Sequence, residues 1–255
     1  MELRKIFNED EVNYDRYRPG YPDALYNDIF RCAALHEGSS VLEIGTGTGQ
    51  ATLPFLQRSC NVTGVELGDR LSAFSKEKFA AYPNFRSVTG DFMELPFSSH
   101  AYDLIFSATA FHWLPAKEAL QKARLLLKPG GTIALFWNHP FPNREDDPTN
   151  MASKRVYDAF RPSSKKQLEF SEAQLCIWEE RLRTAGFSDV QTFMYHRVRT
   201  LTTEQYLGLI NTYSDHRALE ADLKSAFETE MRSSIDAAGG FIRIYDTVDL
   251  YIGKA

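Results

Sequence analysis

Residues 41–49 constrain the fold of this 255-residue chain more than any other segment. They join a short apolar run, residues 41–44, to three glycines at alternate positions, with one acid, Glu43, inside the run. Val and Ile in such a run indicate a parallel strand covered on both faces. Glycines directly after it indicate a backbone with positive φ or one that a ligand approaches closely. Residues 50–56 predict the start of a helix, with Pro54 in its first turn, so the sequence predicts a nucleotide-type cofactor site at the end of a strand.

Further apolar segments that end in acids follow along the chain. Residues 61–67 predict a strand that carries Glu66 at its end, and residues 85–92 predict another that ends in Gly-Asp-Phe, with Asp91. A carboxylate about twenty residues after such glycines accepts hydrogen bonds from ribose hydroxyls, so Glu66 is predicted to bind a ribose. Two more strands are expected at 102–107 and 132–137, separated by a helix over 119–127 and a Lys-Pro-Gly-Gly turn at 128–131.

The spacing of the glycines distinguishes two kinds of cofactor loop. A dinucleotide-binding loop reads G-x-G-x-x-G, and Gln50 stands where its third glycine is needed. The pattern here is E-x-G-x-G-x-G, which resembles motif I of the class I S-adenosylmethionine-dependent methyltransferases. The resemblance extends over residues 41–137 through Glu66, Asp91 and the Lys-Pro-Gly-Gly turn. It implies S-adenosyl-L-methionine as cofactor and a doubly wound, Rossmann-like α/β fold of seven mostly parallel strands, the last inserted antiparallel.

The same resemblance implies where the cofactor lies. The glycine loop approaches the methionine part, Asp91 takes the adenine amino group, and its neighbour Phe92 packs on the ring. Glu43 is expected either to shape the loop or to contact the cofactor amine, and Gly-Asp at 90–91 also suits an ordinary turn. The predicted cofactor-binding residues are Glu43, Gly45, Thr46, Gly47, Gly49, Glu66, Leu67, Asp91, Phe92, Ser107 and Ala108, with Tyr14 and Arg18 from the N-terminal segment.

The N-terminal Tyr-x-x-x-Arg-Pro segment and the Phe-His-Trp at 111–113 resemble those of methyltransferase type 11 proteins related to trans-aconitate methyltransferases. The resemblance implies that Arg18 or the tyrosines close over the cofactor carboxylate, whereas a solvated arginine at a helix end is the alternative. His112 is a candidate base for a hydroxyl or amine acceptor, or else a structural histidine. Tyr21, Trp113 and His139 are the candidate substrate-binding residues, with Trp113 equally suited to anchor the core.

Outside this core, residues 23–34 predict a helix, and 138–148 a proline-broken loop. The remaining expectations are a weak helix within 149–168, a helix over 171–185 capped by Ser171, strands at 190–199 and 241–252, and two helices between 203 and 238. We expect one domain over 1–255, with a core of about 22–137 and 171–255. A helical cap from 1–21, 138–170 and 203–238 is expected to cover the cofactor and define the acceptor.

Composition limits the partners. The net charge of −5 gives no general basic field for polyanions, so a nucleic-acid substrate is not expected. We expect no membrane span and no metal site, because no apolar run is long enough and no His, Cys, Asp or Glu set has metal spacing. Three scattered cysteines favour reduced thiols and a cytoplasmic location. A monomer or a homodimer is expected.

The expected activity is methyl transfer to a small-molecule acceptor, with a carboxylate or a hydroxyl as the candidate group. A carboxylate is already deprotonated at neutral pH and needs no base, whereas a hydroxyl would benefit from one. Three alternatives remain open on this evidence: an aminopropyl transferase on the same fold, a nicotinamide dehydrogenase, and a cofactor-binding protein without catalysis.

Overall fold

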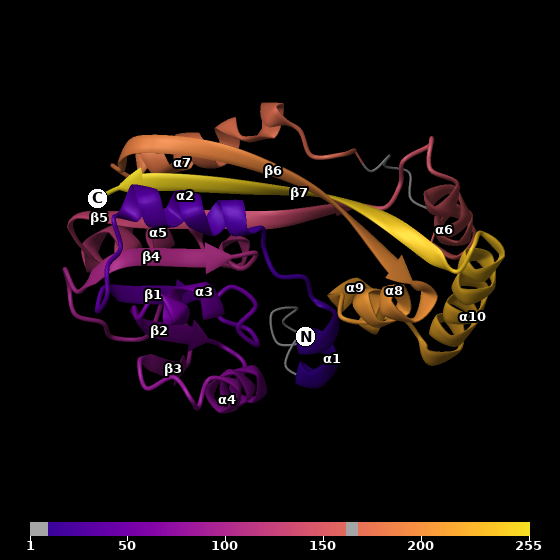
Figure 1. Cartoon of the computed structure of the whole chain (residues 1–255), viewed down its shortest axis with the longest axis horizontal. Coiled ribbons are helices and arrows are strands. Elements are labelled where there is room, and N and C mark those ends of the chain that lie inside the picture. The colour runs from indigo at the N-terminus through magenta and orange to yellow at the C-terminus, as the bar shows by residue number, and fades with distance from the viewer. Residues whose placement is uncertain (1–9, 162–167) are drawn as a thin grey trace.

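The computed structural model describes residues 10–161 and 168–255, which are organised around one seven-stranded sheet (Figure 1). The strand order is β3-β2-β1-β4-β5-β7-β6. Strand β7 runs antiparallel to β5 and β6, and the other neighbouring strands are parallel, which confirms the predicted topology. The strands are β1 Ser40–Ile44, β2 Asn61–Glu66, β3 Phe85–Thr89, β4 Tyr102–Ala108, β5 Leu127–Phe141, β6 Ser188–Thr202 and β7 Phe241–Lys254.

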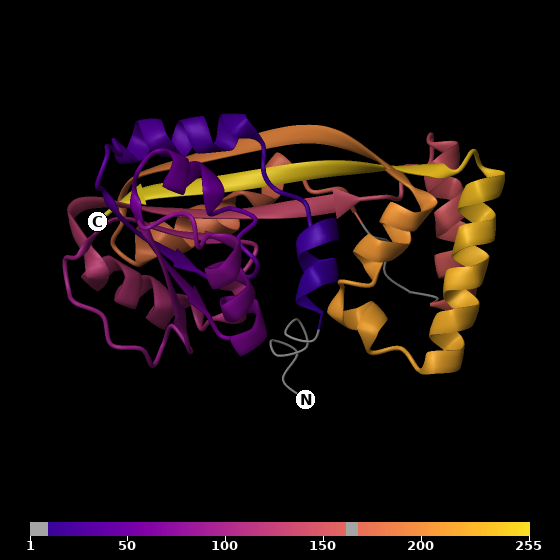
Figure 2. The same ribbon diagram turned by 60° about the horizontal axis from the view of Figure 1, so that its bottom comes forward.

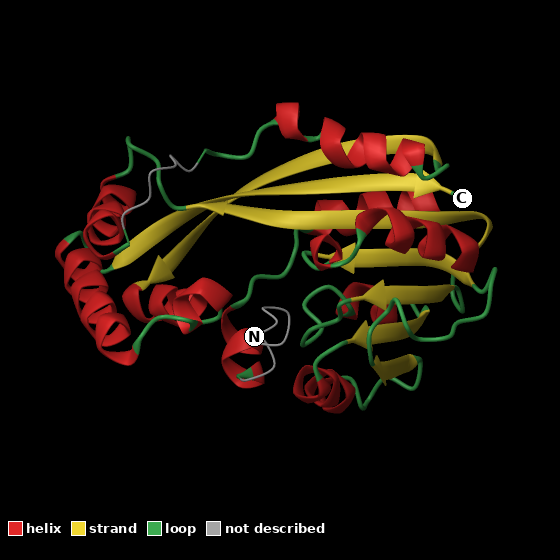
Figure 3. Ribbon diagram, turned by 180° about the vertical axis from the view of Figure 1, so that it is seen from behind, coloured by secondary structure: helices red, strands yellow, loops and turns green. Residues whose placement is uncertain are grey.

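Helices cover both faces of this sheet (Figure 3). Side chains alternate along β1, so Val41 packs in the cluster that includes α2 and α3, while Leu42 and Ile44 pack in the cluster that includes α5 and α7. The helices are α1 Glu11–Tyr17, α2 Asp23–Ala33, α3 Leu53–Gln57, α4 Asp69–Lys78, α5 Ala116–Leu126, α6 Pro148–Phe160, α7 Cys176–Thr184, α8 Thr203–Ile210, α9 Ser214–Arg217 and α10 Ala221–Ala237. Short 3₁₀ turns lie at Phe111–Trp113 and Glu172–Gln174.

Strands β5, β6 and β7 have 14 or 15 residues, two to three times as many as the others, and extend beyond the core (Figure 2). At their far end, α6, α8 and α10 enclose a third hydrophobic cluster around Tyr206, Phe227 and Met231. Helix α1 packs between α4 of the core and α8 of this extension. Where α1 meets α8, the Tyr17 ring occupies the space that a side chain at Gly208 would need. We call α6, α8, α9 and α10 the cap helices.

Three segments differ from the sequence prediction. Residues 138–141 continue β5 instead of starting a loop; β4 has ended there, so Pro140 lies in a strand segment paired with β7 on one side. The predicted turn at 128–131 is a bulge inside β5, where the register with β4 jumps from Leu127 to Thr132. The segment 203–238 contains three helices and not two, because α9 forms a short separate turn between α8 and α10.

Candidate active site

The loop after β1 has the left-handed backbone that its glycines predicted. Gly45 and Gly47 have φ of +77° and +59°. A side chain at Gly45 would also collide with Ala110, since its Cβ would lie 2.4 Å from the Ala110 Cβ. The loop is held on the neighbouring strand by hydrogen bonds from the amides of Gly45 and Thr46 to the Val65 carbonyl. The backbone is therefore fixed in a conformation that leaves its surface open to a ligand.

Gly49 serves a different purpose from the first two glycines. Its φ is +85°, and a Cβ there would lie 2.3 Å from the ring of Phe79, at the end of α4. Gly49 does not line the clefts described below. The structure thus gives it a packing role, and its contact with cofactor stays a prediction.

Glu66 ends β2 and joins the glycine loop to the following turn. Its Oε2 accepts a hydrogen bond from the Gly47 amide at 2.8 Å, and its Oε1 accepts one from the Gly68 amide at 2.9 Å. Burial raises the pKa of Glu66, and these amide hydrogen bonds oppose that rise. The backbone amides thus orient the carboxylate, and its remaining lone pair stays available to a hydroxyl donor.

A first cleft opens over the ends of β1, β2, β3 and β4, with an empty volume of about 950 Å³ including its open mouth. It is lined by Tyr14, Arg18, Ile44, Gly45, Gly47, Val65, Glu66, Leu67, Leu71, Gly90, Asp91, Phe92, Ala108, Thr109, Ala110, His112, Trp113 and Leu114. Ligands of open α/β sheets bind at this edge, where parallel strands end. Most of the residues predicted to contact the cofactor are therefore brought together here.

Asp91 and Phe92 lie at the far end of the first cleft from the glycines. The Asp91 Oδ1 accepts a hydrogen bond from the Met93 amide at 2.8 Å. Phe92 is 3% exposed, and its ring packs toward Phe97. The apolar side chains of Leu67 and Leu71 also line the first cleft. Lys122, on α5, fixes the loop after β3 by donating hydrogen bonds to the carbonyls of residues 92, 93 and 95.

A second cleft shares six residues with the first and continues toward β5 and the cap helices. It is lined by Tyr14, Arg18, Pro19, Tyr21, Glu43, Gly45, Thr46, Gly47, Gln50, Ala51, Ala108, Thr109, Asn138, Pro140 and Tyr213. Glu43 is 1% exposed and accepts a hydrogen bond from Thr52 Oγ1 at 2.6 Å. Burial raises the pKa of Glu43 to about 8, with the Thr52 hydrogen bond acting in the opposite direction. Its carboxyl is therefore poised to change charge near neutral pH.

The N-terminal helix brings Tyr14 and Arg18 to the junction of the two clefts. Arg18 donates to the Thr212 carbonyl at 2.9 Å, and its guanidinium lies over the rings of Tyr14 and Tyr213, at 5.1 and 4.7 Å from their centroids. Arg18 is thus clamped between α1 and the segment that follows α8. Tyr21 reaches the second cleft as well, where its hydroxyl pairs with Thr109 Oγ1 at 2.7 Å.

The histidines and the tryptophan predicted to contact the methyl acceptor lie in two different places. His112 and Trp113 line the first cleft, whereas His139 lies outside both, with its ring stacked on Phe170 and its Nε2 3.1 Å from Asp249. His112 Nδ1 accepts a hydrogen bond from the indole Nε1 of Trp137 at 3.0 Å. Burial lowers the pKa of His112, and the charge on His139 lowers it further.

Of the two residues predicted at the end of β4, one faces the clefts. Ala108 lines both of them. Ser107 is fully buried and its hydroxyl donates to the Ile44 carbonyl at 2.7 Å, so it ties β4 to β1. A cofactor contact by Ser107 stays a prediction.

Sequence reasoning missed Thr109, Asn138 and Tyr213. Thr109 has a φ of +52°, an unusual conformation for a β-branched residue, and its hydroxyl also accepts the Asn138 amide at 3.2 Å. Thr109 follows β4, and Asn138 follows the strand predicted at 132–137, although β5 continues through it, so the strand-end rule applied to Glu66 would have found both. Tyr213 lies in the link between cap helices α8 and α9, and no sequence signal relates it to the core.

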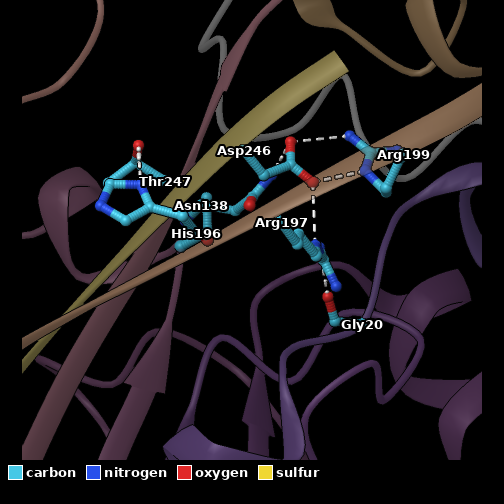
Figure 4. A network of polar contacts seen from close by, with 8 residues as sticks. Gly20, Asn138, His196, Arg197, Arg199, Asp246 and Thr247 are labelled. Atoms are coloured by element: carbon cyan, nitrogen blue, oxygen red, sulfur yellow. Dashed lines mark hydrogen bonds and ion pairs between the residues drawn. The ribbon is translucent and has the colours of Figure 1, made fainter. Parts of the chain in front are cut away.

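A cluster of ion pairs around the buried Asp246 carboxylate contacts Asn138, which lines the second cleft (Figure 4). Asp246 on β7 is 1% exposed and accepts hydrogen bonds from Arg197 and Arg199 on β6, at 2.9 and 2.5 Å. The Asn138 Nδ2 donates to the same carboxylate at 3.2 Å, and Arg197 also donates to the Gly20 carbonyl. Two guanidinium groups against one carboxylate leave net positive charge beside this cleft. The amide of Asn138 is held with its Oδ1 buried and without a hydrogen-bond partner.

Comparison with known proteins identifies the family. A model described as a methyltransferase domain matches residues 41–131, which contain the glycine loop, Glu66 and Asp91. The uncharacterized methyltransferase C25B8.09 of Schizosaccharomyces pombe is 31% identical over 235 residues, which cover 90% of this chain and 86% of that protein. The chain belongs to the class I S-adenosylmethionine-dependent methyltransferases. S-adenosylmethionine is therefore the cofactor of this methyltransferase, as predicted.

A more distant relative and two solved structures of the same fold are also similar to this chain. The malonyl-[acyl-carrier protein] O-methyltransferase of a Marinomonas species is 26% identical over 204 residues, 73% of this chain and 74% of that protein. Phosphoethanolamine N-methyltransferase 2 of Haemonchus contortus shares the fold at a TM-score of 0.57 and 15% identity, covering 97% of this chain and 57% of that one. YcgJ of Bacillus subtilis shares it at 0.57 and 16% identity, with 91% and 98% covered.

The described residues contain no group of His, Cys, Asp and Glu side chains arranged to hold a metal ion. Within residues 10–161 and 168–255, no helix is both long and apolar enough to cross a membrane.

Proposed function

We propose that this methyltransferase binds S-adenosylmethionine in the first cleft and transfers its methyl group to an oxygen of a small molecule in the second. The observation that carries this proposal is the continuity of the two clefts, which meet at Gly45, Gly47, Ala108 and Thr109. In this arrangement Glu66 receives the ribose hydroxyls and Asp91 the adenine amino group. The methionine part lies along the glycine loop, between Glu43 and Arg18.

The residues present suit this cofactor. Gly47 lines both clefts, and a Cβ there would point toward Tyr14 and Gln50, into the space assigned to the cofactor. Arg18 supplies a cation for the methionine carboxylate, and Glu43 an acid beside the amine. When bound, the cofactor supplies an electrophilic methyl group together with its own leaving group. The protein then has to position the two partners and exclude water, which account for much of the acceleration of such reactions.

An oxygen acceptor, either a carboxylate or a hydroxyl, is supported by the charge around the second cleft. Arg197 and Arg199 both pair with the single carboxylate of Asp246, which also accepts from Asn138 of this cleft. Positive charge of this kind favours an anionic ligand. The similar protein from Marinomonas is named as an O-methyltransferase of malonyl-[acyl-carrier protein]. We propose that the cap helices define the acceptor through Tyr213, within one domain spanning residues 1–255.

Arg144 and Lys154 of the extension are less suited to hold an acceptor. They pair with Glu169 and Asp158 and lie outside the second cleft. We further propose a cytoplasmic monomer or homodimer with no nucleic-acid substrate. All three cysteines are free thiols, which supports a reducing compartment.

Calorimetry with S-adenosylhomocysteine tests the cofactor assignment. Glu66→Ala removes both the ribose ligand and the brace on the Gly47 amide, so the affinity should fall at least about tenfold, as expected for hydrogen bonds to a charged group. Glu77→Ala, an exposed change on α4, is the matched control and should bind as the wild type does. Unchanged affinity in Glu66→Ala would remove the ribose assignment. A methyl-transfer screen against small acids, phenols and amines then tests the acceptor.

A further inference from the structure

The hydrogen bond between Trp137 and His112 determines which ring nitrogen of the histidine carries the proton. An indole N–H donates and cannot accept. Because the Trp137 Nε1 lies 3.0 Å from the His112 Nδ1, that nitrogen must present its lone pair to the indole. In the neutral ring, the hydrogen then resides on Nε2. The neutral ring then has no free lone pair that could accept a proton, because the Nδ1 lone pair accepts from the indole and Nε2 carries the hydrogen.

Trp137 is held firmly enough to impose this choice. It is 6% exposed, and its ring stacks on Trp178 with centroids 4.8 Å apart and planes inclined by 22°. The edge of Tyr251 contacts it from another side, and its backbone amide donates to Asp249 at 2.9 Å. The indole therefore cannot rotate away from His112 without disrupting the packing of β5 against α7 and β7.

The other side of the histidine ring is available to a ligand. His112 lines the first cleft beside Ala108, Thr109 and Trp113, and its side chain is exposed. Since Nδ1 is turned toward Trp137, Nε2 lies on the opposite edge of the ring. A charged ring would also place an Nδ1–H against the indole N–H, with two donors facing each other.

We infer that His112 acts as a hydrogen-bond donor through Nε2–H, orienting an oxygen of the methyl acceptor, and that Trp137 is the positioning residue that fixes this tautomer. The inference rests on the proposed function, and it requires the acceptor in the second cleft to extend past Ala108 and Thr109, which line both clefts, to His112 in the first. It replaces the general base expected from the sequence with a donor. With Nδ1 engaged by Trp137 and Nε2 already protonated, neutral His112 cannot take the proton that a hydroxyl acceptor would release, whereas methyl transfer to a carboxylate releases none. This favours the carboxylate over the hydroxyl.

Nitrogen-15 NMR of protein labelled at histidine, saturated with S-adenosylhomocysteine, measures the tautomer directly. The His112 signals, assigned from their absence in His112→Gln, should show a protonated Nε2 and an unprotonated Nδ1 near neutral pH. Trp137→Phe keeps the aromatic packing but removes the indole N–H, and should shift His112 toward a mixture of tautomers. Trp178→Phe, in the same aromatic stack, is the control and should leave the tautomer unchanged. An Nδ1–H tautomer or a charged ring in the wild type would overturn the inference.

Kinetics separate donation from base catalysis. With small aliphatic di- and tricarboxylates as acceptor probes, His112→Gln, whose amide can donate, should keep most of kcat/KM, while His112→Leu should lose roughly 10- to 100-fold. Equal losses in both variants, or turnover of phenols or amines without carboxylates, would refute the donor role. Failure of the wild-type protein to bind S-adenosylhomocysteine would instead refute the proposed function, and the tautomer measured without ligand would still report on the Trp137 contact.

Discussion

Glu43 makes the stability of this methyltransferase depend on pH in an unusual direction. The carboxyl is 1% exposed, and burial raises its pKa from the ordinary value of 4.5 to about 8. The folded protein therefore holds this proton over a pH range in which the unfolded chain has released it. Its contribution to stability is fully present below pH 4.5 and is lost as the pH rises toward 8.

The size of the effect follows from the two pKa values. One pKa unit corresponds to about 1.4 kcal/mol, so the full difference sets an upper limit of about 5 kcal/mol for the loss of stability. About 2 kcal/mol of that loss falls between pH 6.5 and 8.5. Glu43→Gln removes the titration but keeps an oxygen that can accept from Thr52. Its stability relative to the wild type should therefore increase by about 2 kcal/mol over this interval.

Urea unfolding of the ligand-free protein at several pH values measures this difference. Thr52→Val is the matched variant, because it removes the hydrogen bond that opposes the rise and should steepen the pH dependence. Parallel stability curves for Glu43→Gln and the wild type between pH 6.5 and 8.5 would refute the reasoning. Such a result would mean that the carboxyl is ionised in the folded protein at neutral pH.

Three further predictions follow from contacts around the clefts. Asp246→Asn should destabilise the protein by about 2–4 kcal/mol in urea unfolding, because it leaves two arginines without their shared carboxylate, and a loss below about 0.5 kcal/mol would contradict this. Gly49→Ala should cost about 1–3 kcal/mol in the wild type and less in a Phe79→Ala background, where the ring that its Cβ meets is gone; an equal cost in both backgrounds would show that backbone strain accounts for the whole loss. Tyr21→Phe should cost about 1 kcal/mol in thermal unfolding through its hydrogen bond to Thr109, and an unchanged melting temperature would exclude that bond.

The cofactor half of the site could be predicted from the sequence because its determinants are local. The glycine loop, Glu66 and Asp91 each follow a strand with a clear apolar pattern, and parallel strands bring their carboxyl ends to one edge of the sheet. Spacing along the chain then translates directly into proximity. The strand order and the antiparallel β7 were also predictable, through the resemblance to a known family.

The acceptor half could not be predicted in the same way, because it is assembled from distant segments. Tyr213 lies more than a hundred residues after Thr109, and only the packed extension brings them to one cleft. The roles of Gly49 and Ser107 depend on side chains packed against them, namely the Phe79 ring and the β1 backbone. The orientation of His112 depends on an indole hydrogen that the local sequence does not indicate.

The extended strands determine which part of the molecule can move. Between Gln191 and Thr202, β6 pairs with β7 without a break in register, and β7 likewise pairs with β5 from Thr132 to Phe141. Swinging the cap helices away from the core would break many backbone hydrogen bonds along these ladders together. Helix α1 is joined to α4 mainly by two surface ion pairs, Arg70 with Glu11 and Lys78 with Asp15, which are individually weak. The extension is thus a rigid arm on which α1 is docked, and we expect the passage of cofactor and product to part α1 from α4 rather than from the arm.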